Sequence, residues 1–351
     1  MRIFILFLLF VMACSDRPPA EKKGKREKIG DIKVVNKPIL PIVIADHKDT
    51  AITWLNDPNA LDGGDTTSPL VTTLDISDVG FVMTPIWMGN WHPSSGNGTV
   101  DAMVKYDAAL DSTDKKASTW EKDTTASLKN IKWSGHCNGL AAASIMVAEP
   151  VNDVTYKGVL FTVNDIKALL IESWQNSYGK AVGKRCEKQN IEYDSNGRML
   201  DDNCRDVSPA TFHILLTNFL GRFHKPILVD VESGYEVWNS PIITYDVLAK
   251  QSLSLQSATM WLTGTAMDFY AYNPKATQWI YFQTQVTFSD NKKKTYEYIL
   301  EQDGSGQIIG GEWFRESKKN HPDFIWRPTK PNPENPYIDL QKVQDIYNQS
   351  I

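Results

Sequence analysis

The residue best suited to chemistry is Cys137, in the segment Gly135-His136-Cys137-Asn138-Gly139. An apolar, alanine-rich stretch follows and stops before Pro150, which predicts a helix that begins near Cys137 and ends near Ala148. A thiol in the first turn of a helix is stabilised as thiolate, so we expect a lowered pKa and a nucleophile whose own backbone N–H serves an oxyanion hole. The flanking glycines are expected to admit a substrate. The alternative is an inert buried cysteine.

A cysteine nucleophile requires a base, and His213 is the candidate. It lies in the apolar run 211–219, which predicts a strand. If the chain turns at 221–225, that strand pairs with the next one and places Asp230 opposite His213. The carboxylate would then fix the imidazole tautomer, completing a Cys-His-Asp triad. Glu232, on the same face, is the alternative orienting residue. The alternative to a triad is a buried His–Asp pair that only supports the core.

The elements that must position these residues divide along the chain. The segment 99–129 is helical in pattern, whereas short runs rich in aromatic and β-branched residues follow Pro209. This order predicts an α+β fold with a cleft between a helical and a sheet half. We expect one catalytic region over 47–351, helical over about 47–208 and sheet over about 209–327. The predicted strands are 212–219, 226–231, 242–248, 279–288 and 295–300.

Composition excludes several classes of protein. The chain has 351 residues, 42% of them hydrophobic and 11% aromatic, which is too much apolar surface for a disordered protein. The net charge of −5 does not favour nucleic acid as a partner.

The N-terminus resembles an export signal. An apolar run from Ile3 to Ala13 ends at Cys14, in a sequence similar to the bacterial lipobox. We expect a signal peptide over 1–13, lipidation of Cys14, and a charged tether over 14–46. The protein would then be an exported lipoprotein of the bacterial cell envelope, attached to the membrane by lipid. A free cysteine near an ordinary cleavage site is the alternative.

The two remaining cysteines are Cys186 and Cys204, separated by a polar, turn-rich segment. Export places them where disulfides form, and with Cys14 lipidated and Cys137 reduced they are expected to pair. Two unpaired surface thiols are the alternative.

Several motifs resemble those of the transglutaminase elicitors of oomycete plant pathogens and their bacterial relatives. The resemblance implies a papain-like core, a catalytic cysteine at Cys137, and calcium-dependent crosslinking of glutamine to lysine in protein or peptide substrates. The segment 235–241 looks like the family's elicitor peptide, but Ser240 replaces its glutamine and 242–245 lacks basic residues. The other matching motifs are 133–139, 211–213, 217–219, 310–313 and 321–324.

Calcium ligands are not identified by the sequence. The segment 301–312 has oxygen-bearing residues at EF-hand positions, but its flanks alternate like strands, which favours a hairpin. The loop 194–202 is similarly rich in oxygen-bearing side chains. We name no metal ligand and expect no organic cofactor.

The resulting hypothesis is a transglutaminase that transfers an acyl group from a glutamine carboxamide to a primary amine through a cysteine thioester. Trp133, Trp238 and Asn239 are expected to form the acceptor cleft. A papain-like cysteine peptidase or amidase would use the same residues with water as acceptor. A binding protein with a dead site would lack a member of the triad.

Overall fold

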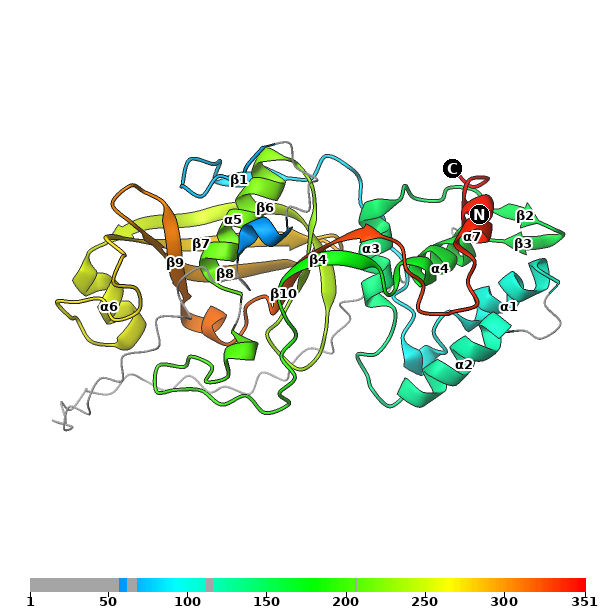
Figure 1. Cartoon of the computed structure of the whole chain (residues 1–351), viewed down its shortest axis with the longest axis horizontal. Coiled ribbons are helices and arrows are strands. Elements are labelled where there is room, and N and C mark those ends of the chain that lie inside the picture. The colour runs from blue at the N-terminus through cyan, green and yellow to red at the C-terminus, as the bar shows by residue number, and fades with distance from the viewer. Residues whose placement is uncertain (1–56, 62–67, 112–115, 206) are drawn as a thin grey trace, which may run out of the picture.

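The molecule is elongated, with a curved antiparallel sheet at one end and a group of helices at the other (Figure 1). This computed structural model describes residues 57–61, 68–111, 116–205 and 207–351. The expected signal peptide, lipidation site and tether lie outside these residues. Within them, no helix combines the length and apolar character needed to cross a membrane.

The helical lobe surrounds an apolar core to which Met103, Phe161 and Leu169 contribute. Its longest well-capped helix begins at Thr162, whose side chain accepts from Asp165 N while the Asp165 carboxylate accepts from Thr162 N. The lobe comprises α1 (Val100–Ala109), α2 (Lys116–Leu128), α3 (Cys137–Met146), α4 (Val163–Trp174), α7 (Leu340–Tyr347) and the hairpin β2 (Val154–Tyr156) and β3 (Val159–Phe161). The helices predicted within 99–129 and after Cys137 are thus confirmed.

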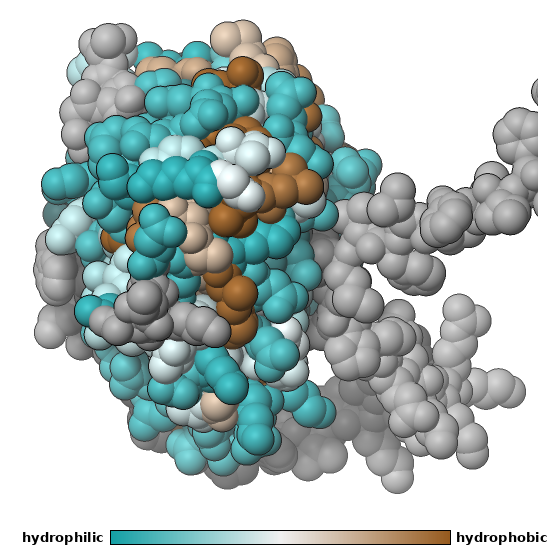
Figure 2. Space-filling model, turned by 90° about the vertical axis from the view of Figure 1, so that its right-hand side faces the viewer, coloured by the Kyte–Doolittle hydropathy of each residue, from teal (hydrophilic) through white to brown (hydrophobic). Residues whose placement is uncertain are grey.

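The free end of this lobe presents a mostly hydrophilic face with apolar residues distributed across it (Figure 2). Exposed apolar side chains of the lobe include Val104, Val151 and Leu160.

The sheet lobe is an eight-stranded sheet with the order β4-β10-β5-β6-β7-β8-β9, and β1 pairs with β6 outside this path. Its core is aromatic, because alternate residues of β7 and β8 such as Phe282, Tyr296 and Tyr298 face inward. The strands are β1 (Val79–Phe81), β4 (Tyr178–Gly183), β5 (Ile227–Asp230), β6 (Asn239–Leu253), β7 (Gln278–Phe288), β8 (Lys293–Gln302), β9 (Ile308–Trp313) and β10 (Phe324–Lys330). Helix α6 (Leu255–Thr263) packs at the far end.

The strands predicted at 226–231, 242–248, 279–288 and 295–300 are confirmed, but the strand predicted at 212–219 is wrong. That segment forms α5 (Pro209–Leu216) and a π-helical turn over Thr217–Arg222. Ser208 caps the helix by accepting from Thr211 N, and proline at the first helical position is preset for a helix. These local signals prevail over the β-branched and aromatic composition.

The two lobes are not consecutive in the chain, contrary to the predicted division at about residue 208. β4 joins the sheet before that position, and α7 returns from the C-terminus to pack against α4. The start of β6 lies against α3, so the lobes meet at the beginning of both elements (Figure 1).

Candidate functional site

Cys137 is the first residue of α3, as expected, and its side chain is buried, with 5% of the residue exposed. The preceding loop is held by His136 N, which donates to Trp91 O at 2.8 Å. A Cβ on Gly135 would lie 2.6 Å from the Trp91 ring, and one on Gly139 would lie 2.2 Å from Ile171 O. The glycines therefore allow Trp91 and α4 to approach closely, and the expectation that they admit a substrate is wrong.

The segment that enters β6 lies against the thiol. Cys137 Sγ donates to Val237 O at 3.8 Å. Asn239 Nδ2 donates to Asn138 Oδ1, and Trp326 Nε1 donates to Asn239 Oδ1 at 2.6 Å. Asn239 is thereby fixed from both lobes, which holds the strand entry in contact with the first turn of α3.

The thiol is protonated in this arrangement. Burial raises the pKa of Cys137 to about 11, although hydrogen bonds from the backbone N–H groups of Asn239, Asn138 and Cys137 itself oppose that shift. The predicted lowered pKa is therefore wrong, because desolvation outweighs the helix terminus. The same three N–H groups could stabilise negative charge once it forms at this position.

The negative charge of Asp230 also contributes to the raised pKa of Cys137. Asp230 is fully buried, and burial raises its pKa to about 7. Its Oδ1 accepts from Trp238 N at 2.8 Å, while Oδ2 is buried without a partner among the described residues. The Val237–Trp238 peptide thus lies between the two groups, with its N–H toward Asp230 and its carbonyl toward Cys137.

The structure does not bring His213 to this site, and the predicted triad geometry is wrong. On α5, His213 Nδ1 bonds to Tyr298 Oη at 2.9 Å, and its ring packs on Phe282 with 4.7 Å between centroids. Phe282 pairs with Lys250, eleven residues after Asn239 (239 to 250) on β6, which is about 36 Å along a strand at about 3.3 Å per residue. Burial lowers the pKa of His213 to about 3. It is a neutral core residue that does not contact Asp230.

Glu232 has no orienting role toward His213 either. It lines a cavity of about 410 Å³ between α3 and the β7–β8 hairpin, and its charge contributes to the raised pKa of Asp230. Trp238 and Asn239 line the same cavity, as the predicted acceptor cleft requires. The remaining lining residues include Trp87, Met88, Leu140, Ala141, Ser144, Ser240, Pro241, Phe288, Asp290 and Lys292–Lys294.

Trp133, by contrast, is not among the cavity-lining residues. It packs edge-on against Tyr235 at 5.9 Å, and the Arg185 guanidinium lies 4.9 Å from its ring centroid. The expectation that it shares a cleft with Trp238 is wrong. The aromatic neighbour of Trp238 is Trp91, at 5.7 Å between centroids.

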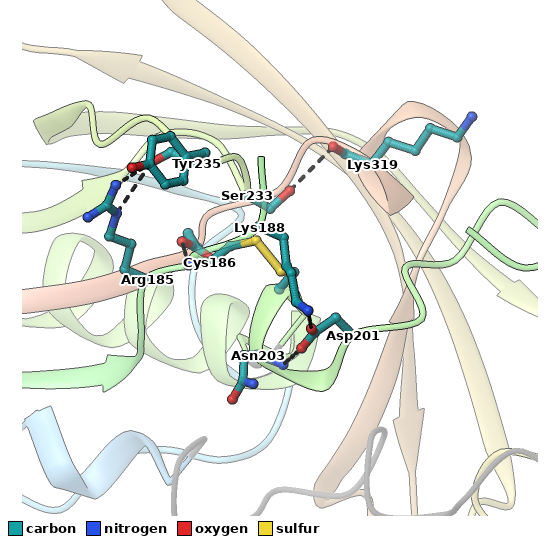
Figure 3. The surroundings of a disulfide bond; sticks show 10 residues. Arg185, Cys186, Lys188, Asp201, Asn203, Ser233, Tyr235 and Lys319 are labelled. Carbon is teal, nitrogen blue, oxygen red and sulfur yellow. Dashed lines mark hydrogen bonds and ion pairs between the residues drawn. A yellow bond between two sulfur atoms is a disulfide. The ribbon is translucent and has the colours of Figure 1, made fainter. Parts of the chain in front are cut away.

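The predicted disulfide between Cys186 and Cys204 is confirmed (Figure 3). The two cysteines are 18 positions apart, so the bridge is worth about 3 kcal/mol through restriction of the unfolded chain. Next to it, Arg185 Nη2 donates to Tyr235 O at 2.8 Å, and Ser233 Oγ donates to Lys319 O (Figure 3). These bonds hold the segment that precedes Val237.

The residues present do not fit calcium at either oxygen-rich loop. The segment 301–312 is the end of β8, a turn and β9, as the hairpin prediction expected. Glu301 points into the core, where it accepts from Tyr270 Oη and Asn273 Nδ2. In the other loop, Asp194 accepts from the backbone N–H groups of Asn196 and Arg198. Among the described residues of these two loops, no three carboxylates have oxygens within 4.8 Å of one another.

Sequence reasoning missed three residues near the thiol. Trp326 positions Asn239, and the buried Glu121 and Glu172 surround His136, with Glu172 Oε1 at 2.8 Å and Glu121 Oε1 at 3.6 Å from its Nε2. A signal existed for Glu172, since an acid directly after the run Ala168-Leu169-Leu170-Ile171 falls within a buried stretch. Glu121 lies in a polar helix with no such signal.

Comparison with known proteins places this site in a family. A model of the family described as "Transglutaminase elicitor" matches residues 97–339, a range that contains Cys137, Asp230 and Asn239. The fold is similar to the crystal structure of the GP42 transglutaminase from Phytophthora sojae, with a TM-score of 0.69 and 22% identity, covering 84% of this chain and 98% of the other. No curated protein sequence matches the chain. On the extent of the family match, the chain belongs to the transglutaminase elicitor family.

Proposed function

We propose that this protein is a protein-glutamine γ-glutamyltransferase with Cys137 as its nucleophile. The observation that carries the proposal is the position of this thiol, at the first residue of α3 and against the segment that enters β6. Trp238 and Asn239 of that segment line the neighbouring cavity. Cys137 itself is not among the lining residues, so a glutamine side chain in this cavity would reach the sulfur only after the segment moves.

The reaction proceeds in two steps. The Cys137 sulfur attacks the γ-carboxamide carbon, the C–N bond breaks, and ammonia leaves with the thiol proton, so that a thioester remains. A primary amine, such as that of lysine, then attacks the thioester carbon and loses a proton as the thiolate is released. The backbone N–H groups that face the sulfur support the developing negative charge.

In this proposal Asp230 is the catalytic base, the role that the sequence predicted for His213. A carboxylate with a pKa of about 7 is partly ionised at neutral pH and can both accept and return a proton. Transfer requires the Val237–Trp238 peptide to move aside or a water molecule to bridge the two groups, because this peptide separates Asp230 from the thiol. Asp230 Oδ2, which has no hydrogen-bond partner among the described residues, is the atom that would accept the proton of the thiol.

The proposed partners are proteins or peptides that carry glutamine and lysine, in the cell envelope of a bacterium. Lipidation of Cys14 would hold the enzyme at a membrane. The Cys186–Cys204 disulfide supports export, since such bridges persist in oxidising compartments.

The test is incubation of the purified chain with a glutamine-containing peptide and a fluorescent primary amine, following both amine incorporation and ammonia release. We expect both signals in equal amounts, and neither in Cys137→Ala. Ammonia release without incorporation would identify an amidase instead, and cleavage of the peptide without ammonia release would identify a peptidase. Undiminished activity in Cys137→Ala would refute the proposal.

A further inference from the structure

Three buried ionisable side chains form a cluster that includes the residue directly before the nucleophile. Glu121 comes from α2, His136 is the residue that precedes α3, and Glu172 comes from α4. One ligand-type atom from each lies within 4.8 Å of the others. Glu121 and Glu172 are fully buried, and His136 is 4% exposed.

Only one oxygen of each carboxylate has a hydrogen-bond partner among the described residues. Thr99 donates to both, from its N to Glu121 Oε1 at 3.1 Å and from its Oγ1 to Glu172 Oε1 at 2.5 Å. The second oxygen of each, Glu121 Oε2 and Glu172 Oε2, is buried without a partner among the described residues. Buried carboxylate oxygens are costly unless something donates to them or binds them.

The imidazole is oriented as in a metal ligand. His136 Nδ1 lies 3.2 Å from His92 O, so a proton on Nδ1 donates to that carbonyl. This leaves Nε2 facing the two carboxylates. A backbone carbonyl on Nδ1 that leaves Nε2 free is the usual support for a histidine that binds a metal.

The charges also require a cation. Two carboxylates carry a charge of about −2, which a single imidazolium reduces to about −1, whereas a divalent ion beside a neutral imidazole balances it. Glu334 adds further negative charge, because its carboxyl interacts with all three residues.

We propose that Glu121, His136 and Glu172 form a structural binding site for a divalent transition-metal ion of the zinc or manganese type. Imidazole with carboxylates suits these ions, whereas calcium takes oxygen ligands. The ion would tie α2 and α4 to the residue that precedes Cys137 and so fix the start of α3. This site does not depend on the proposed transferase activity, since occupancy is measured without substrate.

Metal content of the purified full chain tests the site. After preparation without chelators, elemental analysis is expected to find about one zinc or manganese ion per chain. Dialysis against a strong chelator should remove it and lower the melting temperature, and Zn²⁺ or Mn²⁺ should restore both while Ca²⁺ does not. A chain that holds no metal and whose melting temperature none of these ions changes would show that protons alone balance the cluster, and would overturn the proposal.

Substitutions of the proposed ligands test whether the ion binds at this cluster. Glu172→Gln and His136→Gln should lose the metal or bind it at least 10-fold more weakly, whereas Glu334→Gln, a neighbour outside the three ligands, should retain it. If the ligand variants do not fold, X-ray absorption of the wild type decides, with imidazole nitrogen and carboxylate oxygen neighbours expected. Retention of metal in folded Glu172→Gln and His136→Gln, a sulfur ligand shell, or binding of Ca²⁺ by these same residues would contradict the assignment.

Discussion

Two buried histidines, one in each lobe, have opposite surroundings. His136 is enclosed by two carboxylates, and although burial alone would lower its pKa, Glu172 and Glu121 raise it well above 6.5. His213 is enclosed by Phe282 and Tyr298, and burial lowers its pKa to about 3. At similar burial, the direction of the pKa shift therefore depends on the partner residues. Buried polar groups gather where the two lobes meet, whereas the core of the sheet lobe is mainly aromatic.

The largest expected difference separates Cys137 from His213 in activity. Cys137→Ala should lower amine incorporation by at least about 10³-fold, because the nucleophile is absent. His213→Gln should retain activity per folded molecule within about threefold, since about 36 Å of strand separates its neighbour Phe282 from the start of β6 beside the thiol. Initial rates normalised to folded protein, measured by circular dichroism, provide the comparison. A His213→Gln variant that folds yet is as inactive as Cys137→Ala would restore His213 as the base.

The second prediction concerns Asp230. Asp230→Asn should lower turnover by about 10²-fold to 10⁴-fold, because the proposed proton acceptor is lost. In the wild type, activity should rise with pH through about 7 as Asp230 ionises, and the variant should lack this limb.

The Asp230→Asn variant should be more stable than the wild type although it is less active. The pKa of Asp230 is raised from 3.8 when unfolded to about 7 when folded, so its ionisation destabilises the fold as pH rises from about 4 to 7. Asp230→Asn should therefore unfold at higher urea concentration than the wild type at pH 8 and show little difference at pH 4. A variant that loses activity and stability together would assign Asp230 a structural role only.

The third prediction concerns His213 in the core of the sheet lobe and its effect on stability at low pH. Because the pKa of His213 is lowered from 6.5 to about 3, the unfolded chain binds a proton more readily than the folded one, and stability falls as pH drops below 6.5. At roughly 1.4 kcal/mol per unit, the loss is about 3 kcal/mol at pH 4. His213→Gln should remove this part of the acid dependence in urea unfolding measured at pH 7 and pH 4. An unchanged dependence would place the acid-sensitive group elsewhere.

The smallest predicted effect is on product distribution. Trp238 lines the cavity and contacts Trp91 across the lobe boundary, so its removal should admit water to the thioester. Trp238→Ala should preserve ammonia release while lowering the ratio of amine product to glutamate by about 10-fold, or about 1.4 kcal/mol. Trp133→Ala is the matched control, since that ring lies outside the cavity. Equal loss of both signals with a lower melting temperature would assign Trp238 to packing alone.

The sequence was informative where structure depends on neighbours along the chain. The start of α3 follows from a loop, an alanine-rich stretch and Pro150, and the strands of the sheet follow from aromatic and β-branched runs. The α+β class and the family resemblance are confirmed. The strand predicted around His213 is wrong because the helix-start signal at Ser208 and Pro209 outweighs the strand-like composition of the segment that follows.

The site itself depended on contacts that no local pattern records. The Val237–Trp238 peptide contacts both Asp230 and Cys137, and Glu121 reaches His136 from a different helix. The raised pKa of Cys137 follows from burial by a segment about 100 residues away in the chain, as the Cys137–Val237 contact shows. Spacing along the sequence does not reveal such desolvation.

The segment before β6 covers the Cys137 thiol, and this has a consequence for oxidation of its sulfur. Peroxide attacks the thiolate, and the Cys137 sulfur is both protonated and covered, with its hydrogen directed to Val237 O. Tyr235 and Ser233 anchor this segment next to the disulfide (Figure 3). The Cys137 thiol should therefore resist conversion to the sulfenic acid while the segment covers it, and displacement of the segment by substrate would expose it. Substrate would both activate the thiol and expose it to damage.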